Sequence, residues 1–233
     1  MKKWFLFPLI ALTITIVPTS KAQNGCEGYM LVEKGVTLEY TDYDAKNVVT
    51  GSRSSTITDL TTNGTILTVT IHSISKDKKG KVSSESDVLF TCENGVIKID
   101  MKSMMDQKMM DGMEGMEMTI DQTNIEFPAT FTEGQNLPDG SMNMTVSSGG
   151  MQIMKLTAKM TERKVEVSEN ITTPAGTFNC FKLSQVMTTE MMGRATRTKS
   201  VDWFSMGIGS VRSEHFDESG ALVSYSVLTN IVR

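Results

Sequence analysis

The stretch 172–228 constrains the fold most, because it has the pattern of four consecutive β-strands. Its extended segments are rich in β-branched and aromatic residues, and they are separated by Pro-Ala-Gly, Met-Gly and Asp-Glu-Ser-Gly breaks. Alternating strands and tight turns of this kind are typical of an antiparallel meander. The C-terminal quarter of the chain is therefore predicted to be entirely β.

The preceding residues repeat the same pattern of strands and turns. Asn63-Gly64 and Asn94-Gly95 are dipeptides suited to two-residue hairpins, because both residue types accept a positive φ. Asp44, Asp77 and Asp217 are each followed three residues later by Asn or Gly, which predicts a four-residue turn in which the Asp side chain bonds the backbone ahead of it. We expect an all-β single domain of about ten to twelve antiparallel strands. A sheet of that size must curve into a half-barrel or open barrel, or split into two layers, to limit its exposed edges.

Residues 1–22 have the pattern of a signal peptide rather than of a folded element. Lys2 and Lys3 precede a short apolar run, and Ser20-Lys21-Ala22 is a small-x-small cleavage site. The run is too short for a stable membrane span. The residues before Cys26 lack the Leu-x-small pattern of a lipoprotein signal, so soluble export to the periplasm or the medium is favoured over lipidation. The mature chain is predicted to be one antiparallel β-domain, 23–233, with no transmembrane segment.

The charge of the chain argues against two classes of partner. The formal net charge is −4, and loss of Lys2, Lys3 and Lys21 with the leader makes it three units more negative. Nucleic acids and anionic lipid head groups need clustered Lys and Arg, and the sequence has no such cluster. Nucleic acid is therefore not an expected partner.

The three cysteines, Cys26, Cys92 and Cys180, allow three different disulfides. An oxidising compartment permits a bridge, and Cys92 and Cys180 lie within predicted strands, whereas Cys26 lies near the start of the mature chain. We favour Cys92 with Cys180. The alternative is that all three are reduced and buried.

Methionine is concentrated in one segment, 101–118, which holds eight of the 19 methionines of the chain. The apolar spacing between Met104 and Asp111 suits a short helix, which Gly112 and Gly115 would loosen or end. Thioether sulfur is a soft ligand for Cu(I), so Met109, Met110, Met113 and Met116 are a candidate copper site. The structural alternative is that methionine fills an adaptable apolar face that covers a sheet edge or the mouth of a cavity.

Acid–base or nucleophilic catalysis has little support in the sequence. Only His72 and His215 have side chains that titrate near neutral pH without perturbation, and His215 and Glu214 point to opposite faces of a predicted strand. The chain contains no Gly-x-Ser-x-Gly, His-Glu-x-x-His or Cys-x-x-Cys motif. We expect a protein that is not an enzyme, with no resident cofactor unless copper binds.

Three motifs resemble a known family. They are TPAGTF-x-C-F-K-L at 173–183, W-x-x-x-G-x-G-x-V-R-S-E at 203–214 and D-x-x-G-x-L-x-S-Y-x-V-L at 217–228. The chain resembles the TapB-like group of secreted bacterial proteins, which is similar to a broader domain-of-unknown-function family of exported all-β proteins. The resemblance implies a strongly curved antiparallel sheet and an envelope location, and it implies no catalytic residues.

The expected function is binding rather than catalysis. Gly207 and Gly209 are predicted to permit a sharp bend that lets Trp203 pack against a neighbouring strand, and the alternative is that Trp203 or Phe204 faces a ligand. A curved sheet of this kind can hold an acyl chain or lipopeptide on its concave face, with the methionine segment as a lid. A Cu(I)-binding envelope protein is one alternative, and an envelope scaffold of unknown oligomeric state is another.

Overall fold

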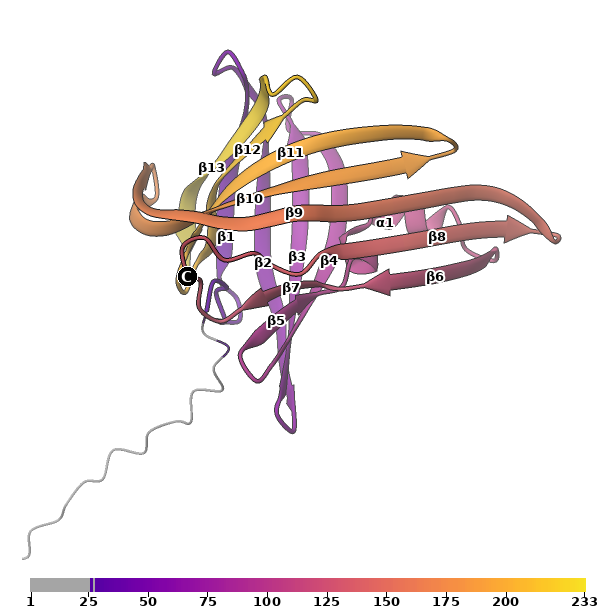
Figure 1. Ribbon diagram of the computed structural model, residues 1–233, viewed down its shortest axis with the longest axis horizontal. Helices are drawn as coiled ribbons and strands as arrows, with labels where there is room; N and C mark the ends of the chain where they lie inside the picture. The colour runs from indigo at the N-terminus through magenta and orange to yellow at the C-terminus, as the bar shows by residue number, and fades with distance from the viewer. Residues whose placement is uncertain (1–25, 27) are drawn as a thin grey trace, which may run out of the picture.

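A computed structural model describes residues 26 and 28–233 and contains one antiparallel sheet that curls into a nearly closed barrel (Figure 1). The predicted signal peptide, 1–22, lies outside the described residues. The strands are β1 (Thr37–Asp44), β2 (Val49–Asn63), β3 (Ile66–Asp77), β4 (Val82–Glu93), β5 (Val96–Ile99), β6 (Glu117–Thr123), β7 (Ile125–Pro128), β8 (Gly140–Ser148), β9 (Met151–Thr173), β10 (Gly176–Met191), β11 (Arg194–Ser205), β12 (Gly209–Phe216) and β13 (Leu222–Val232). The described helices are a 3₁₀ turn, η1 (Lys102–Met104), and a short α-helix, α1 (Gln107–Asp111).

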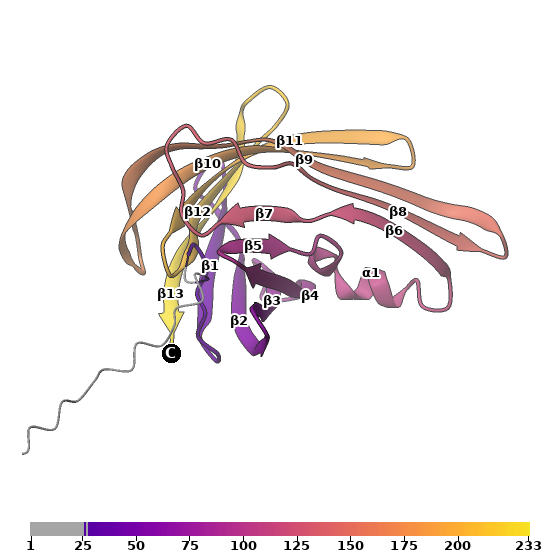
Figure 2. The same ribbon diagram turned by 60° about the horizontal axis from the view of Figure 1, so that its bottom comes forward.

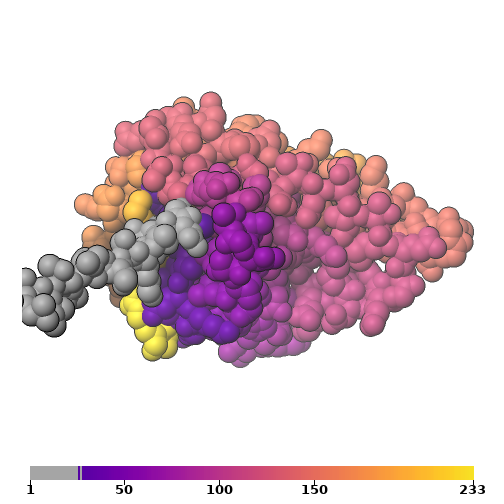
Figure 3. Space-filling model, turned by 90° about the horizontal axis from the view of Figure 1, so that it is seen from below, coloured from indigo at the N-terminus to yellow at the C-terminus, as the bar shows by residue number. Residues whose placement is uncertain are grey.

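The order of the strands explains how the sheet nearly closes. It runs β6-β8-β9-β10-β11-β12-β13-β1-β2-β3-β4-β5-β7, so the two edge strands, β6 and β7, are consecutive in the chain and separated only by Asn124. The sheet folds over on itself, so that β8–β11 lie above β1–β5 (Figure 2) and cross them (Figure 1). The long hairpins of the later strands, pink and orange, extend to the right beyond the purple N-terminal strands (Figure 3).

The expected all-β fold is confirmed, with corrections to the strand count and the closure. The described chain has 13 strands instead of ten to twelve, and one of the additional strands arises because Asn124 separates β6 from β7, which lie at opposite edges of the sheet. The meander predicted over 172–228 is present as β10 to β13. Residues 151–173 form one long strand, β9, of 23 residues. β9 stays continuous past an irregularity near Glu162, which has a φ of 54°.

The predicted turn chemistry is also present. Asp44 Oδ1 accepts hydrogen bonds from the N–H groups of Lys46 and Val48, at 2.8 and 2.9 Å, and Asn47 has a φ of 63°. Asp77 and Asp217 make the equivalent pairs of bonds. A carboxylate that accepts two backbone donors stabilises each turn locally, so these turns set the register of three hairpins.

The two Asn-Gly hairpins differ from each other. Asn94 and Gly95 both have a positive φ, as a type I′ turn requires. At the other hairpin Asn63 pairs with Ile66, so Gly64 and Thr65 are the central residues and Gly64 alone of the two has a positive φ. That turn is one residue later than predicted, because Gly in the first central position suits a type II′ turn.

The methionine segment covers a free sheet edge. β5 pairs only with the last four residues of β4, and this leaves the earlier part of β4 without a neighbouring strand. There Ser103 Oγ accepts a hydrogen bond from the N–H of Leu89 at 2.8 Å, and Asp106 Oδ2 accepts one from Glu85 at 3.2 Å. Asp106 also caps α1, and these backbone donors lower its pKa. The segment therefore satisfies backbone groups that an exposed edge would leave open.

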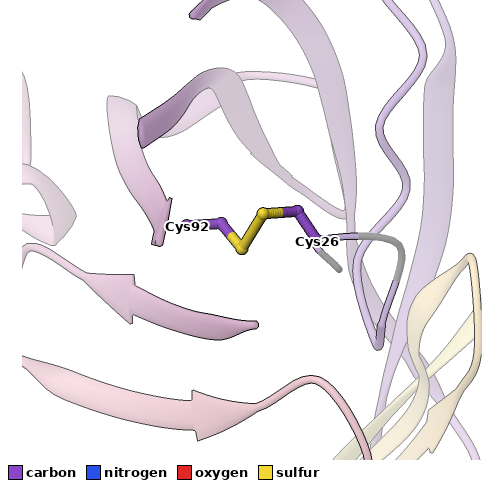
Figure 4. Close-up of a disulfide and its surroundings, with 2 residues drawn as sticks. All are labelled: Cys26 and Cys92. Atoms are coloured by element: carbon purple, nitrogen blue, oxygen red, sulfur yellow. A yellow bond between two sulfur atoms is a disulfide. The ribbon is translucent and has the colours of Figure 1, made fainter. Parts of the chain in front are cut away.

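The disulfide joins Cys26 to Cys92, so the predicted pairing of Cys92 with Cys180 is wrong (Figure 4). Cys180 is a buried free thiol, and burial raises its pKa to about 11. Cys26 reaches Cys92 because the following residues are folded onto the barrel, where Gly28 O accepts a hydrogen bond from the N–H of Gly207 at 2.7 Å. A sulfur in a disulfide cannot also carry a thioether-linked lipid, so the pairing argues against lipidation at Cys26.

Candidate functional site

The interior of the barrel contains a cavity of about 260 Å³ between β1–β5, β7 and the turn between β11 and β12. Apolar side chains make up most of its wall: Leu31, Leu38, Ile57, Ile71, Val88, Phe90, Ile97, Ile99, Phe127, Phe204 and Ile208. Every lining residue on β1–β5 belongs to an alternating set, such as Ile97 and Ile99 or Val88 and Phe90. This is the inward half of the period-two pattern of each strand.

The strand register arranges these side chains in rows. Ile57 on β2 pairs with Ile71 on β3, which pairs with Val88 on β4. The next row along β4 pairs Phe90 with Ile99 on β5. The apolar wall is therefore continuous across four strands.

A cluster of aromatic rings forms part of the cavity wall, which Tyr29, Phe127 and Phe204 line. Tyr29 stacks on Phe131 with ring centroids 4.0 Å apart, and Phe127 lies 5.6 Å from Phe204. Phe131 also contacts Phe204 edge-on at 6.1 Å. Such ring pairs contribute about 0.5–1.5 kcal/mol each beyond their buried area. They attach the segment 28–31 and the loop after β7 to β11.

Another part of the wall is polar, and it begins beside the aromatic cluster, because Ser210 pairs with Phe204. Arg53 on β2 lies over the ring of Tyr40, with its guanidinium carbon 4.4 Å from the ring centroid. Tyr40 Oη donates to the backbone oxygen of Ser210 at 2.9 Å, and Ser55 and Ser73 share a hydrogen bond of 2.9 Å. Arg53, Tyr40, Ser55, Ser73 and Ser210 all line the cavity, so it has an apolar part and a polar part.

Two carboxyl groups lie beside this polar part. Asp42 follows Leu38 and Tyr40 on the inward face of β1, and burial raises its pKa, whereas Arg53 and His215 oppose that rise. Asp202 on β11 is buried, and burial raises its pKa although the hydrogen bond from Ser213 acts in the opposite direction. Arg53 acts electrostatically on both carboxyl groups.

Asp202 continues into a buried polar chain that reaches the barrel seam. Gln185 Nε2 donates to Asp202 at 3.1 Å, and Gln185 Oε1 accepts from Arg163 Nε at 3.4 Å. Arg163 is 2% exposed, and its Nη1 donates to the carbonyl oxygens of Glu126 on β7 and Pro138 before β8. Desolvation lowers the pKa of Arg163 to about 10. This side chain therefore links β9 to β7 where the sheet is not continuous.

The two aromatic residues proposed as ligand-facing lie on opposite faces of β11. Phe204 lines the cavity. Trp203 does not line it, because adjacent residues of a strand point to opposite faces, and its Nε1 donates to Glu169 at 2.6 Å on the other face. Gly207 and Gly209 have φ values of 71° and 104° and lie against the segment 28–29. That the bend at these glycines is what lets Trp203 pack against its neighbouring strand stays a prediction.

The four methionines of the candidate copper site are divided between two environments. Met109 and Met113 pack against the core, whereas Met116 is 36% exposed. Met110 lies on α1 and is half-buried. Copper binding by these residues stays a prediction.

The histidines lie apart from each other. His72 lies on the outer face between β3 and β4, with Nδ1 2.7 Å from Asp87 and Nε2 3.3 Å from Glu85. His215 has no hydrogen bond to Asp202 or Ser213 within the described part of the chain, where Ser213 instead donates directly to Asp202. Among the residues that the structure describes, no group of three or more His, Cys, Asp or Glu could hold a metal ion.

Sequence reasoning missed Arg53 and Asp202 as residues of the interior. One signal was available for Arg53. It precedes Ser55 and Ile57 at alternating positions in β2, so a charge shares the inward face of a strand with an aliphatic side chain.

This combination defines a class: a nearly closed, single-sheet β-protein with an amphipathic interior cavity. The chain belongs to the DUF3108-like family, whose model matches residues 33–228. The match does not distinguish the TapB-like group, so that assignment stays a prediction. No curated protein sequence matches the chain.

Two solved structures share the fold. One is a protein of Bacteroides fragilis with a YmcC-like fold, inferred to be exported, with 20% identity and a TM-score of 0.70 over 89% of this chain and 100% of that one. The other is an inferred lipoprotein of Parabacteroides distasonis, with 22% identity and a TM-score of 0.70 over 89% of this chain and 99% of that one. Within the described residues, no helix is long and apolar enough to cross a membrane.

Proposed function

We propose that this protein is exported and binds an apolar ligand, such as an acyl chain, in the interior cavity, without catalysing a reaction. The observation that carries the proposal is the continuous apolar wall formed by Ile57, Ile71, Val88, Phe90 and Ile99. Well-packed protein interiors contain few voids larger than a water molecule. A cavity of about 260 Å³ that lies beside a polar group therefore has the character of a ligand site.

The size of the cavity limits the ligand. It exceeds the engineered apolar cavity of about 150 Å³ that binds benzene, and it lies just below the range of about 300–1,000 Å³ for drug-sized ligands. One acyl chain of medium length suits this volume better than a lipid with two or more chains. Met104 both lines the cavity and is 46% exposed, so the methionine segment is well placed to form its rim.

Export is supported by the relatives and by the leader-like residues 1–22. One solved relative is inferred to be exported and the other to be a lipoprotein. A disulfide between Cys26 and Cys92 suits an oxidising compartment.

Filling the cavity should abolish binding. We expect Val88→Trp to weaken the binding of laurate to delipidated protein by roughly tenfold or more, because the indole occupies the space of the chain at the cost of some strain. The measurement is displacement of an environment-sensitive fluorescent fatty acid. Val223→Trp makes the same exchange at an exposed position of β13 and should leave the affinity unchanged. Equal binding by the two variants, or no binding of laurate by the wild-type protein, rules out the interior cavity as the site.

A further inference from the structure

Arg53 forms no ion pair with the residues that the structure describes, although Asp42 and Asp202 lie within its electrostatic reach. It is half-buried on the cavity wall, and no carboxylate oxygen of a described residue lies within 4.0 Å of its guanidinium nitrogens. Its Nε is buried and has no hydrogen-bond partner within the described chain. A buried donor left without a partner costs about 1–3 kcal/mol, and more when it is charged, so a bound group that accepts from it would recover that cost.

The other arginines that are not exposed have more partners. Arg163 donates to two carbonyl oxygens and to Gln185, although its Nη2, like Arg53 Nε, is buried without a partner in the described chain. Arg212 forms an ion pair with Glu214 at 2.7 Å. Arg212 also stacks on a tyrosine ring, Tyr225, at 4.9 Å, much as Arg53 stacks on Tyr40. Arg212 therefore has both a tyrosine ring and a carboxylate, whereas Arg53 has only the ring among the described residues.

The position of Arg53 matches the polar end of an amphipathic molecule. Arg53, Ser55 and Ile57 follow one another on the inward face of β2, so the wall changes from cationic to hydroxylic to aliphatic over about 13 Å. On β3, Ser73 and Ile71 repeat the change from polar to apolar beside them. A chain lying from Arg53 towards Phe90 would meet a steadily more apolar surface.

We infer that the ligand is an amphipathic monocarboxylate, with its carboxylate bound by Arg53 and its tail against Ile71, Val88 and Phe90. The guanidinium fork matches a carboxylate bidentately. Asp42 and Asp202 share the electrostatic environment of Arg53, so a doubly charged phosphate meets about twice the repulsion from two carboxyl groups, against about twice the attraction to one arginine. This inference rests on the proposed function and adds the chemical class of the ligand to it.

The test compares three probes of one chain length, decanoate, decanol and decyl phosphate, on delipidated protein by isothermal titration calorimetry. We expect the wild-type protein to bind decanoate more tightly than decanol or decyl phosphate. Arg53→Met keeps an apolar stem but removes the charge, and it should weaken decanoate binding by about 10- to 100-fold while leaving decanol binding unchanged. Arg212→Met, the matched change on the outer face, should alter neither.

The possible outcomes distinguish a failure of the head-group inference from a failure of the proposed function. If none of the three probes binds the wild-type protein, the proposed function fails. If decanoate and decanol bind the wild-type protein equally and Arg53→Met changes neither, the head-group inference fails while the apolar site stands. Tighter binding of decyl phosphate than of decanoate overturns the choice of carboxylate.

The stability of the variant provides a separate control. Arg53→Met loses the stacking on Tyr40 and the attraction to Asp42 and Asp202, but it also removes a buried donor without a partner, so its melting temperature should stay close to that of the wild-type protein. If the variant does not fold, Arg53→Lys keeps the charge without the fork. The Arg53→Lys protein should still prefer decanoate over decanol, but less strongly than the wild-type protein. If it loses the binding of both decanol and decanoate, Arg53 does not act on the head group alone, which contradicts the inference.

Discussion

Removal of the disulfide between Cys26 and Cys92 is expected to lower the free energy of unfolding by about 4 kcal/mol, because the bridge closes a loop with a sequence separation of 66 residues. A cross-link of that span restricts the unfolded chain far more than it restricts the barrel. The bridge also holds the segment that follows Cys26, from which Tyr29, Met30 and Leu31 line the cavity. Its loss should therefore weaken ligand binding as well as stability.

The measurement is urea denaturation of the double variant Cys26→Ala with Cys92→Ala, compared with the wild-type protein under oxidising and reducing conditions. The reduced wild-type protein should resemble the double variant. Cys180→Ala removes the buried free thiol and controls for the loss of a small core side chain, which should cost much less. A double variant within about 1 kcal/mol of the oxidised wild-type protein would show that the bridge does not constrain the unfolded chain as described.

Arg163→Met is expected to destabilise the fold by about 3–5 kcal/mol, because it leaves the carbonyl oxygens of Glu126 and Pro138 and the side chain of Gln185 without their donor. Two effects oppose each other here. Burial of a guanidinium is costly, and the lowered pKa of Arg163 reflects that cost. Methionine fills the same space without that cost. We expect the loss to win, because several buried acceptors lose a partner at once and the stacking on Phe127 at 4.6 Å is also lost.

The control for this prediction is Arg197→Met. Arg197 pairs with Glu162 at 2.7 Å, but both side chains are exposed, so the exchange should change stability by no more than about 0.5–1 kcal/mol. Equilibrium denaturation of both variants is the measurement. If the Arg163→Met protein is as stable as the wild-type protein, the cost of burying the guanidinium equals the stabilisation from its hydrogen bonds and its stacking, and the prediction is wrong.

The sequence contained enough local information to predict the strands and most of the turns. Asp44, Asp77 and Asp217 each make the predicted bonds within four residues, and such short-range chemistry is visible in the order of residues alone. The meander of β10 to β13 was predictable for the same reason, because consecutive antiparallel strands pair with their neighbours in sequence.

Long-range contacts could not be predicted in this way. The pairing of Cys26 with Cys92 depends on the segment 28–31 crossing to the turn at Gly207, and no local pattern encodes that contact. Arg163 bonds the backbone at Glu126 and Pro138, which lie 37 and 25 residues away in the chain, so this contact too is not encoded locally. The cavity was expected only as the concave face of a curved sheet. Its polar part was missed, because Arg53 and Asp202 come from separate strands that only the completed barrel brings together.

The central claim is that a single amphipathic chain lies inside the barrel, and crystallography of the protein with a terminally brominated decanoate tests it most directly. The anomalous signal of bromine locates the end of the chain without any assumption about the rest of the ligand. We predict one bromine peak within the cavity, near Val88, Phe90 and Ile99, with carboxylate density at Arg53. Bromine found only on the outer surface, or an interior filled by the side chains of the protein itself, would contradict the account.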